Sequence, residues 1–178
     1  KAVMAPFIPG FDEMTHVYAE SGSIMKTSCN VSIASCGQKS EGYFDLVVTA
    51  RSSESRTRGD FCDHYVNYDK RSSQAYMKHS GDKSNLGNLV HTVDFLSGDN
   101  DSHGLVVLVG YNQMHLRKWF GKTAGLFIVD HNSRISTFVP MDLSNTTVRD
   151  NTSIVPLLFR RSREGMTFKV MDTMETGG

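Results

Sequence analysis

Short apolar stretches separated by turn-forming residues limit what this chain can fold into more than any other feature of the sequence. Residues 126–129 are apolar, residues 130–133 are polar, and Ile135, Thr137 and Val139 then alternate with other side chains up to Pro140. Asp, Asn and Ser favour turns because their side chains bond to nearby backbone, and Pro cannot donate a hydrogen bond to a sheet. The segment therefore predicts two strands joined by a turn.

The same pattern recurs along the chain, whereas long helical periodicity is absent and only residues 114–120 could hold a turn or two of helix. The predicted strands are 23–34, 43–50, 87–96, 104–111, 126–129, 135–139, 153–159 and 166–171. Seven or eight short strands with turns between them are typical of an all-β sandwich or barrel. The predicted core residues are Val93, Phe95, Leu105, Val107, Val109, Phe138, Leu158, Phe168 and Val170.

The length of the chain indicates how many domains it forms, and its net charge indicates which partners it would attract. At 178 residues the chain is most simply one domain, and its 19 basic and 19 acidic side chains cancel, so no net field attracts nucleic acid or a membrane surface. No apolar run reaches transmembrane length. We expect an N-terminal arm over residues 1–22, with one strand in 15–19, followed by a single domain over 23–178. The start at Lys1 fits proteolytic release from a precursor, either a polyprotein or a chain that carried a signal peptide.

Three cysteines, Cys29, Cys36 and Cys62, cannot form a disulfide framework. Cys29 and Cys36 could pair across a turn, but free thiols are the simpler expectation. No CxxC spacing is present and His64 is the nearest histidine to any cysteine, so we expect no zinc site built on them and no metal or cofactor elsewhere.

Several short motifs have a possible function but are also compatible with plain turns. Arg58-Gly59-Asp60 matches an integrin-binding tripeptide, and Asn30, Asn145 and Asn151 open glycosylation sequons. Asp130, His131 and Ser133 contain the residue types of a hydrolase triad, but neighbours on a strand end cannot converge by themselves, so a turn is the better interpretation. No signature of an enzyme is found, and we expect no catalytic residues.

The order of strand and loop residues resembles that of the jelly-roll capsid proteins of picorna-like (Picornavirales) positive-strand RNA viruses. The residues that carry the resemblance are Asp130, Val139-Pro140, Ser144-Asn145-Thr146-Thr147 and Arg149, with the flanking strands 87–96, 104–111, 153–159 and 166–171. The Pro-Pro usual after the fifth strand is missing, since Asn112-Gln113 follows Tyr111. In its small size the chain most resembles the coat proteins of plant-infecting, secovirus-type members of this group.

This resemblance implies an eight-stranded antiparallel jelly-roll β-sandwich with an extended N-terminal arm, acting as a structural subunit of an icosahedral shell around genomic RNA. Its partners would be other capsid subunits and, weakly and without sequence preference, RNA; its location would be the virion and, before assembly, the host cytoplasm. The residues expected at a subunit interface or against RNA are Trp119, Phe120, Arg160, Arg161 and Arg163. The alternative is a secreted or surface β-sandwich module that binds a receptor or glycan.

Overall fold

The computed structural model describes residues 8–38, 43–52, 64–67, 69–73, 77–85, 88–95, 101–111, 124–139, 153–171 and 176–177. Within these residues, fifteen strands and one short 3-10 helix, η1, make up the regular structure. Their bounds are η1 Phe11–Glu13, β1 Thr15–Tyr18, β2 Ile24–Thr27, β3 Val31–Gln38, β4 Tyr43–Ser52, β5 His64–Val66, β6 Ser72–Ser73, β7 Met77–His79, β8 Lys83–Asn85, β9 Asn88–Phe95, β10 Ser102–Tyr111, β11 Ala124–Asp130, β12 Ile135–Phe138, β13 Ser153–Ser162, β14 Gly165–Val170 and β15 Thr176–Gly177.

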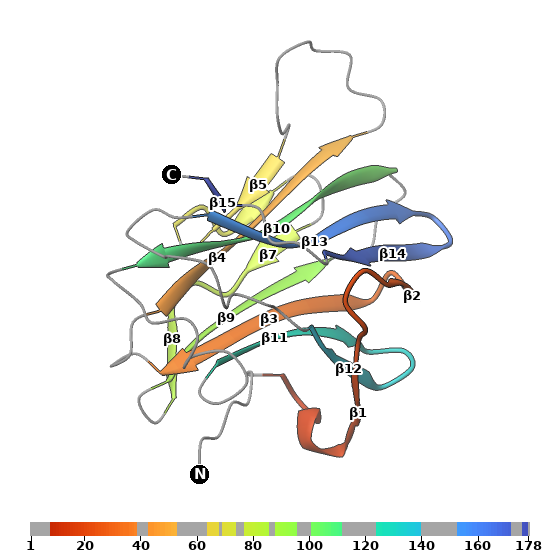
Figure 1. The fold of residues 1–178 in the computed structure, drawn as a ribbon, viewed down its shortest axis with the longest axis horizontal. Helices are drawn as coiled ribbons and strands as arrows, with labels where there is room; N and C mark the ends of the chain where they lie inside the picture. The colour runs from red at the N-terminus through yellow and green to blue at the C-terminus, as the bar shows by residue number, and fades with distance from the viewer. Residues whose placement is uncertain are drawn as a thin grey trace.

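The strands form two sheets (Figure 1). The first sheet has eight strands in the order β1-β12-β11-β3-β9-β7-β6, with β8 also paired to β9. The second has seven strands in the order β2-β14-β13-β10-β4-β5, with β15 also paired to β13. The two sheets confirm the predicted all-β sandwich. The eight-stranded count and the jelly-roll order are not confirmed, because the sheets are larger and β13 pairs with β14 as a hairpin within one sheet.

Most predicted strands are present within a few residues of their expected ends. The stretch 23–34 is divided between the two sheets, because β2 pairs with β14 while β3 pairs with β9 and β11. The hairpin inferred from residues 126–139 is formed by β11 and β12, where Phe127 lies opposite Phe138. Alternation and turn chemistry therefore locate most of the longer strands but do not assign them to sheets, and the short strands β5, β6, β7, β8 and β15 were not predicted.

The N-terminal segment packs against its own domain. Ile8, Phe11 and Met14 are buried in a second apolar cluster with residues of the first sheet, and Phe11 makes an edge-on contact with Phe127. β1 extends the same sheet by parallel pairing with β12. Residues 8–18 thus pack against the first sheet.

The main core lies between the two sheets, and Val93, Phe95, Phe168 and Val170 are buried there as predicted. The predicted phase of β10 is wrong: Val106 and Leu108 are buried, while Leu105, Val107 and Val109 are half-buried. The run Leu-Val-Val-Leu-Val contains no polar residue that could identify the solvent face. The same error affects Leu158 in β13, which is half-buried between the buried Leu157 and Phe159, and Phe138 is half-buried in the second cluster.

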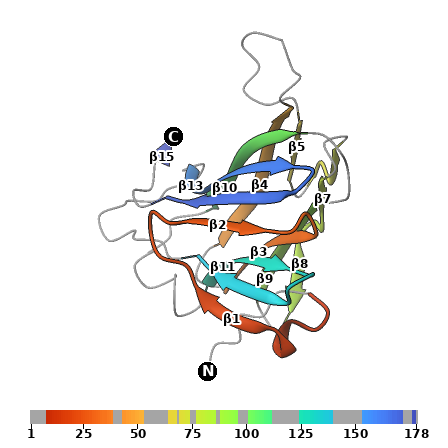
Figure 2. The same cartoon turned by 90° about the vertical axis from the view of Figure 1, so that its right-hand side faces the viewer.

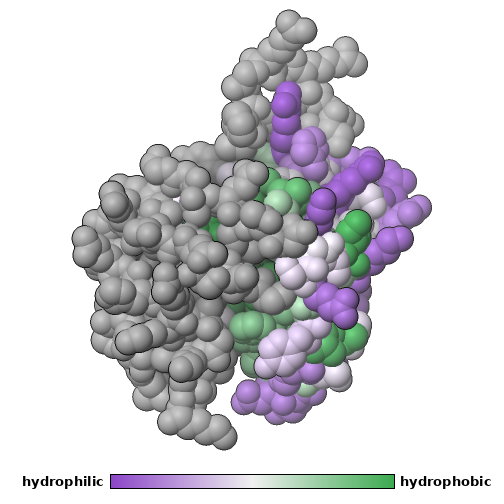
Figure 3. All heavy atoms as spheres, in the orientation of Figure 1, coloured by the Kyte–Doolittle hydropathy of each residue, from purple (hydrophilic) through white to green (hydrophobic). Residues whose placement is uncertain are grey.

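Edge strands of both sheets carry exposed apolar side chains. Figure 2 shows β14 and β2 above β12 and β1 on one side of the molecule. Tyr18 in β1 is 80% exposed and Ile24 in β2 is 65% exposed. Figure 3 shows hydrophobic residues of the described chain in separate small groups among hydrophilic ones on the face it presents. Among the described residues, no helix is long and apolar enough to cross a membrane.

Candidate metal centre and the neighbouring cavity

Two carboxylates and a histidine from three parts of the chain meet at the interface of the sheets. Asp45 lies in β4 of the second sheet, His91 lies in β9 of the first, and Asp82 lies between β7 and β8. Their ligand-type atoms all lie within 4.8 Å of one another. These three residues are called the Asp-Asp-His cluster below.

The cluster is partly sheltered from water. The imidazole of His91 is 1% exposed, the side chain of Asp45 is 11% exposed, and that of Asp82 is 49% exposed. His91 Nε2 lies 2.6 Å from Asp82 Oδ1 and 3.7 Å from Asp45 Oδ1. Both carboxylates therefore approach the same ring nitrogen, and solvent reaches the cluster from the Asp82 side.

A second histidine, His79, holds the turn that carries Asp82. The backbone N–H of Gly81 donates to His79 Nδ1 at 2.8 Å, so Nδ1 is the acceptor and Nε2 carries the proton. Nε2 then donates to the carbonyl of Leu46 at 2.9 Å. Gly81 has a φ of 74°, a left-handed conformation that glycine adopts without steric cost. His79 thus fixes the Asp82 turn against β4, the strand that also carries Asp45.

Burial shifts the protonation of Asp45 and His79. Burial raises the pKa of Asp45 above its ordinary value; His91 partly opposes the rise and Asp82 adds to it, because like charges disfavour ionisation. Burial lowers the pKa of His79 from 6.5 to about 4, with a further contribution from His91. His79 is therefore neutral at pH 7, as its two hydrogen bonds require.

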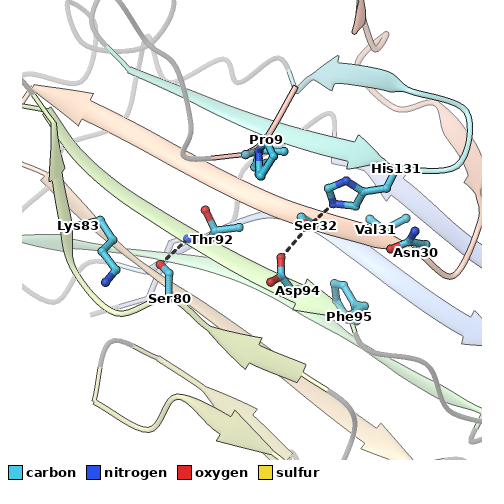
Figure 4. A pocket seen from close by; sticks show the side chains of 11 residues that line it. Pro9, Asn30, Val31, Ser32, Ser80, Lys83, Thr92, Asp94, Phe95 and His131 are labelled. Carbon is cyan, nitrogen blue, oxygen red and sulfur yellow. Dashed lines mark hydrogen bonds between the residues drawn. The ribbon is translucent and has the colours of Figure 1, made fainter. Parts of the chain in front are cut away.

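An open cavity of about 700 Å³ lies close to the cluster (Figure 4). Thr92 and Asp94 line it from β9, and they flank His91 and Val93, whose side chains point to the opposite face because strand residues alternate. Ser32 lies at its floor on β3, and Ser32 Oγ donates to Asp94 Oδ1 at 2.6 Å. The other polar residues of the lining include Lys83 from β8 and His131 from the turn after β11.

Ser32, Asp94 and His131 form a hydrogen-bonded group, called the Ser32 trio below. Ser32 and Asp94 are opposite each other in the β3–β9 pairing, which places the carboxylate beside the hydroxyl. His131 Nε2 lies 2.8 Å from Ser32 Oγ. A serine between a carboxylate and an imidazole contains the residue types of a hydrolase site, so the directions of its hydrogen bonds decide what it can do.

The directions of these hydrogen bonds do not match a hydrolase triad. The single hydroxyl proton of Ser32 is given to Asp94, because an ionised carboxylate can only accept. His131 Nε2 must then donate to Ser32 Oγ, so it cannot take the serine proton as a general base. The trio is a fixed hydrogen-bonded group, and it leaves Ser32 without an activating base in this arrangement.

The structure places the residues expected to face other subunits or RNA in different environments. Trp119 and Phe120 lie outside the described residues. Arg160 and Arg163 are exposed, and Arg163 lies in the turn between β13 and β14. Arg161 is 1% exposed, so its guanidinium does not reach the surface of this chain, in contrast to the expectation of a contact through all three arginines. Strand alternation explains the difference, since Arg161 faces inward with Phe159 while Arg160 faces outward.

Other sequence motifs fall only partly within the described residues. Arg58-Gly59-Asp60, Cys62, Asn145 and Asn151 lie outside them, whereas Cys29 and Cys36 are free thiols, as expected. Residues 131–134 form a turn, which agrees with the interpretation of that segment.

Asp130 has a structural role beside this turn. Its carboxylate accepts hydrogen bonds from the Ser28 backbone at 3.1 Å, the Ser28 hydroxyl at 2.6 Å and the Asn132 backbone at 3.1 Å. Burial raises the pKa of Asp130, but these hydrogen bonds outweigh it, so the pKa is lowered overall.

Sequence reasoning missed both the Asp-Asp-His cluster and the Ser32 trio. Their members are far apart in the chain and share no spacing motif. One signal was present: His91 interrupts the apolar stretch Leu-Val-His-Thr-Val of a predicted strand, where a polar ring requires a partner once it is buried.

Comparisons with known proteins add little. No protein-family model matches the chain, and no curated protein matches it. One solved structure, described as "Crystal structure of unknown function protein SAV2460", aligns with a TM-score of 0.48 and 13% sequence identity over 81% of this chain and 91% of that one. A function for this chain therefore has to be inferred from its own residues.

Proposed function

We propose that this protein is a β-sandwich module that binds a divalent metal ion through Asp45, Asp82 and His91. The observation that carries the proposal is the convergence of two carboxylates on the buried Nε2 of His91, with all three ligand-type atoms within 4.8 Å. Two carboxylates this close repel each other, which is one cause of the raised pKa of Asp45. A dication would neutralise both carboxylates at once.

The donor set favours a first-row transition ion over calcium. Zn²⁺ takes His nitrogen and Asp oxygen at about 2.0–2.2 Å, and three protein ligands leave a fourth position open. Two ligands of one such ion are roughly 3–4 Å apart in tetrahedral geometry, and the Nε2–Oδ1 distance from His91 to Asp45 is 3.7 Å. Asp82 would have to move slightly away from His91, and its half-exposed position permits this. Ca²⁺ prefers six to eight oxygen ligands, more than these residues provide.

Binding would connect the two sheets, because Asp45 and His91 belong to different ones. The expected result is stabilisation of the folded state. An ion present at 100 times its dissociation constant adds about 2.7 kcal/mol to the free energy of unfolding. The proposed role is therefore a structural metal site that could also present one open coordination position to a ligand.

The test is thermal unfolding and titration calorimetry of the protein with Zn²⁺, Mn²⁺ or Ca²⁺, after treatment with a chelator. We expect one Zn²⁺ per chain, a raised unfolding temperature, and loss of both effects in Asp82→Asn. Asp12→Asn is the matched control, because Asp12 is an exposed carboxylate in η1. A chain that binds none of the three ions, or an Asp82→Asn variant that binds as well as wild type, would show the proposal to be wrong.

Protons should compete with the ion. Metal ligands must be deprotonated, and Asp45 holds its proton to a higher pH than an ordinary aspartate because its pKa is raised. Zinc affinity is therefore expected to fall as the pH is lowered through the raised pKa of Asp45. Calorimetry in buffers of different ionisation enthalpy would measure the protons released on binding.

Assembly into a capsid, as the sequence resemblance implies, is a second proposal. The two-layer β-sandwich and the exposed Tyr18 and Ile24 on edge strands support it, since apolar edge strands favour pairing between chains. The jelly-roll order is part of this proposal, and the β13–β14 hairpin within one sheet counts against it. Analytical ultracentrifugation at micromolar concentration is the test: a monomer that does not associate would refute it.

A further inference from the structure

The cavity that Ser32 lines carries an inference that is independent of metal binding. Its residues come from the N-terminal segment, from β3 and the residue before it, from β8 and the turn before it, from β9, and from the turn after β11, so five parts of the chain converge on one open hollow. A volume of about 700 Å³ is within the range of small-molecule sites. Figure 4 shows Lys83 toward one end, Asp94 and Ser32 in the middle, and His131 and Asn30 toward the other end.

The Ser32 trio and Asn30 are held in place by hydrogen bonds before any ligand binds. Ser32 is 1% exposed and links Asp94 to His131. The backbone N–H of His131 donates to the carbonyl of Asn30 at 2.9 Å, and the Asn30 side chain donates to Asn132 at 3.1 Å. Asp94 uses Oδ1 for Ser32, and its second oxygen, Oδ2, can accept from a ligand. Preorganised groups of this kind lose little entropy on binding.

The charges and the lining limit the chemistry of the ligand. The carboxylate of Asp94 opposes an anion, and the ammonium of Lys83 opposes a cation. A purely apolar ligand would displace water from the polar floor and would leave the polar groups there without the hydrogen bonds that the water had made. Ile8 and Pro9 nevertheless provide an apolar wall beside that floor. These features favour a ligand without net charge, and a molecule with hydroxyl groups along its edges and a C–H face can bond to the polar floor and pack on the apolar wall.

We infer that this cavity binds a neutral carbohydrate. One sugar hydroxyl would donate to Asp94 Oδ2 and another would accept from Lys83, while the C–H face of the ring packs on Pro9 beside Ile8. Because the cavity is open to solvent, it would admit one end or an internal unit of a longer glycan. Hydrogen bonds to an ionised group are stronger than neutral ones, so loss of the Asp94 carboxylate should weaken binding about tenfold or more.

The experiment is ligand-observed NMR of the intact chain with a panel of neutral mono-, di- and trisaccharides at millimolar concentration. At least one sugar is expected to bind, with affinity reduced about tenfold or more in Asp94→Asn. Asn keeps an oxygen that accepts from Ser32, so the floor is preserved. Asp12→Asn serves as the control. His131→Gln, which alters the other end of the trio at a half-exposed turn position, is the second variant if Asp94→Asn fails to fold.

The outcomes decide the inference separately from the metal proposal. Binding by wild type and Asp12→Asn, weakened in Asp94→Asn or His131→Gln, supports it whether or not zinc binds to Asp82. Absence of binding by every sugar in the panel overturns it. Sugar binding that is unchanged in folded Asp94→Asn and His131→Gln also overturns it, because the sugar would then be bound elsewhere.

Discussion

Replacing His79 with glutamine should remove a specific part of the acid sensitivity of this protein. His79 is 1% exposed, and its pKa is lowered from 6.5 to about 4 by burial and by the neighbouring His91. The folded protein therefore binds fewer protons than the unfolded chain between these two values. Stability contributed by neutral His79 is fully present above about pH 6.5 and is lost as the pH falls toward 4.

The magnitude follows from the same two values. One unit of pKa corresponds to about 1.36 kcal/mol, so a fall from 6.5 to about 4 corresponds to about 3 kcal/mol of unfolding free energy at most. Glutamine can accept from Gly81 with its oxygen and donate to Leu46 with its nitrogen, as His79 does, but it does not titrate. The variant should therefore lose less stability than wild type between pH 7 and pH 4.

Urea unfolding at a series of pH values measures this difference. His103→Gln is the matched control, because His103 is exposed on β10. The expected result is a wild-type stability curve that falls more steeply than that of His79→Gln, with His103→Gln following wild type. Parallel curves for wild type and His79→Gln would refute the assignment of a buried neutral imidazole.

Three further predictions concern the core and the thiols. Phe168→Ala should lower the free energy of unfolding by about 3–5 kcal/mol, measured by urea titration, because Phe168 is fully buried between the sheets. Gly104→Ala should lower the unfolding temperature, measured by calorimetry, since a Cβ there would overlap the carbonyl oxygen of Thr49 on the paired strand and the ring of Phe159. Cys36 should stay unmodified by a thiol reagent in the folded chain, with labelling mapped by mass spectrometry, because burial raises its pKa to about 12 while the thiolate is the reactive form.

The longer strands could be predicted from the sequence because their signal is local, whereas the short strands β5 to β8 lie in largely polar segments without clear alternation and were missed. Alternation and turn residues located β9, β11, β12 and β14 to within a few residues. The inward face of β10 could not be found in this way, since the unbroken apolar run over residues 105–109 carries no contrast between the two faces. The sheet that each strand joins could not be predicted either, because it depends on pairing between segments that are distant in the chain.

The candidate metal site could not be predicted for a related reason. A zinc motif is visible in a sequence when its ligands share one loop or one helix. Here Asp45, Asp82 and His91 come together only after the two sheets have packed, and each residue alone resembles an ordinary strand or turn residue. The missing CxxC spacing therefore carries no information about this cluster, which contains no cysteine.

The strand pairing explains why the cluster forms where it does. β5 pairs with β4 only over Val48–Ala50, so within the described chain this edge of β4 has no strand partner at Asp45 and Leu46. His79, from the opposite sheet, supplies a donor to the Leu46 carbonyl at this point, and His91 faces the Asp45 carboxylate. Side chains thus replace a neighbouring strand where β5 ends. Polar groups at the interface of two sheets must be satisfied, and neutral His79 does this for the Leu46 carbonyl where β5 ends. The carboxylates of Asp45 and Asp82 beside His91 still repel each other, and the proposed dication would neutralise both.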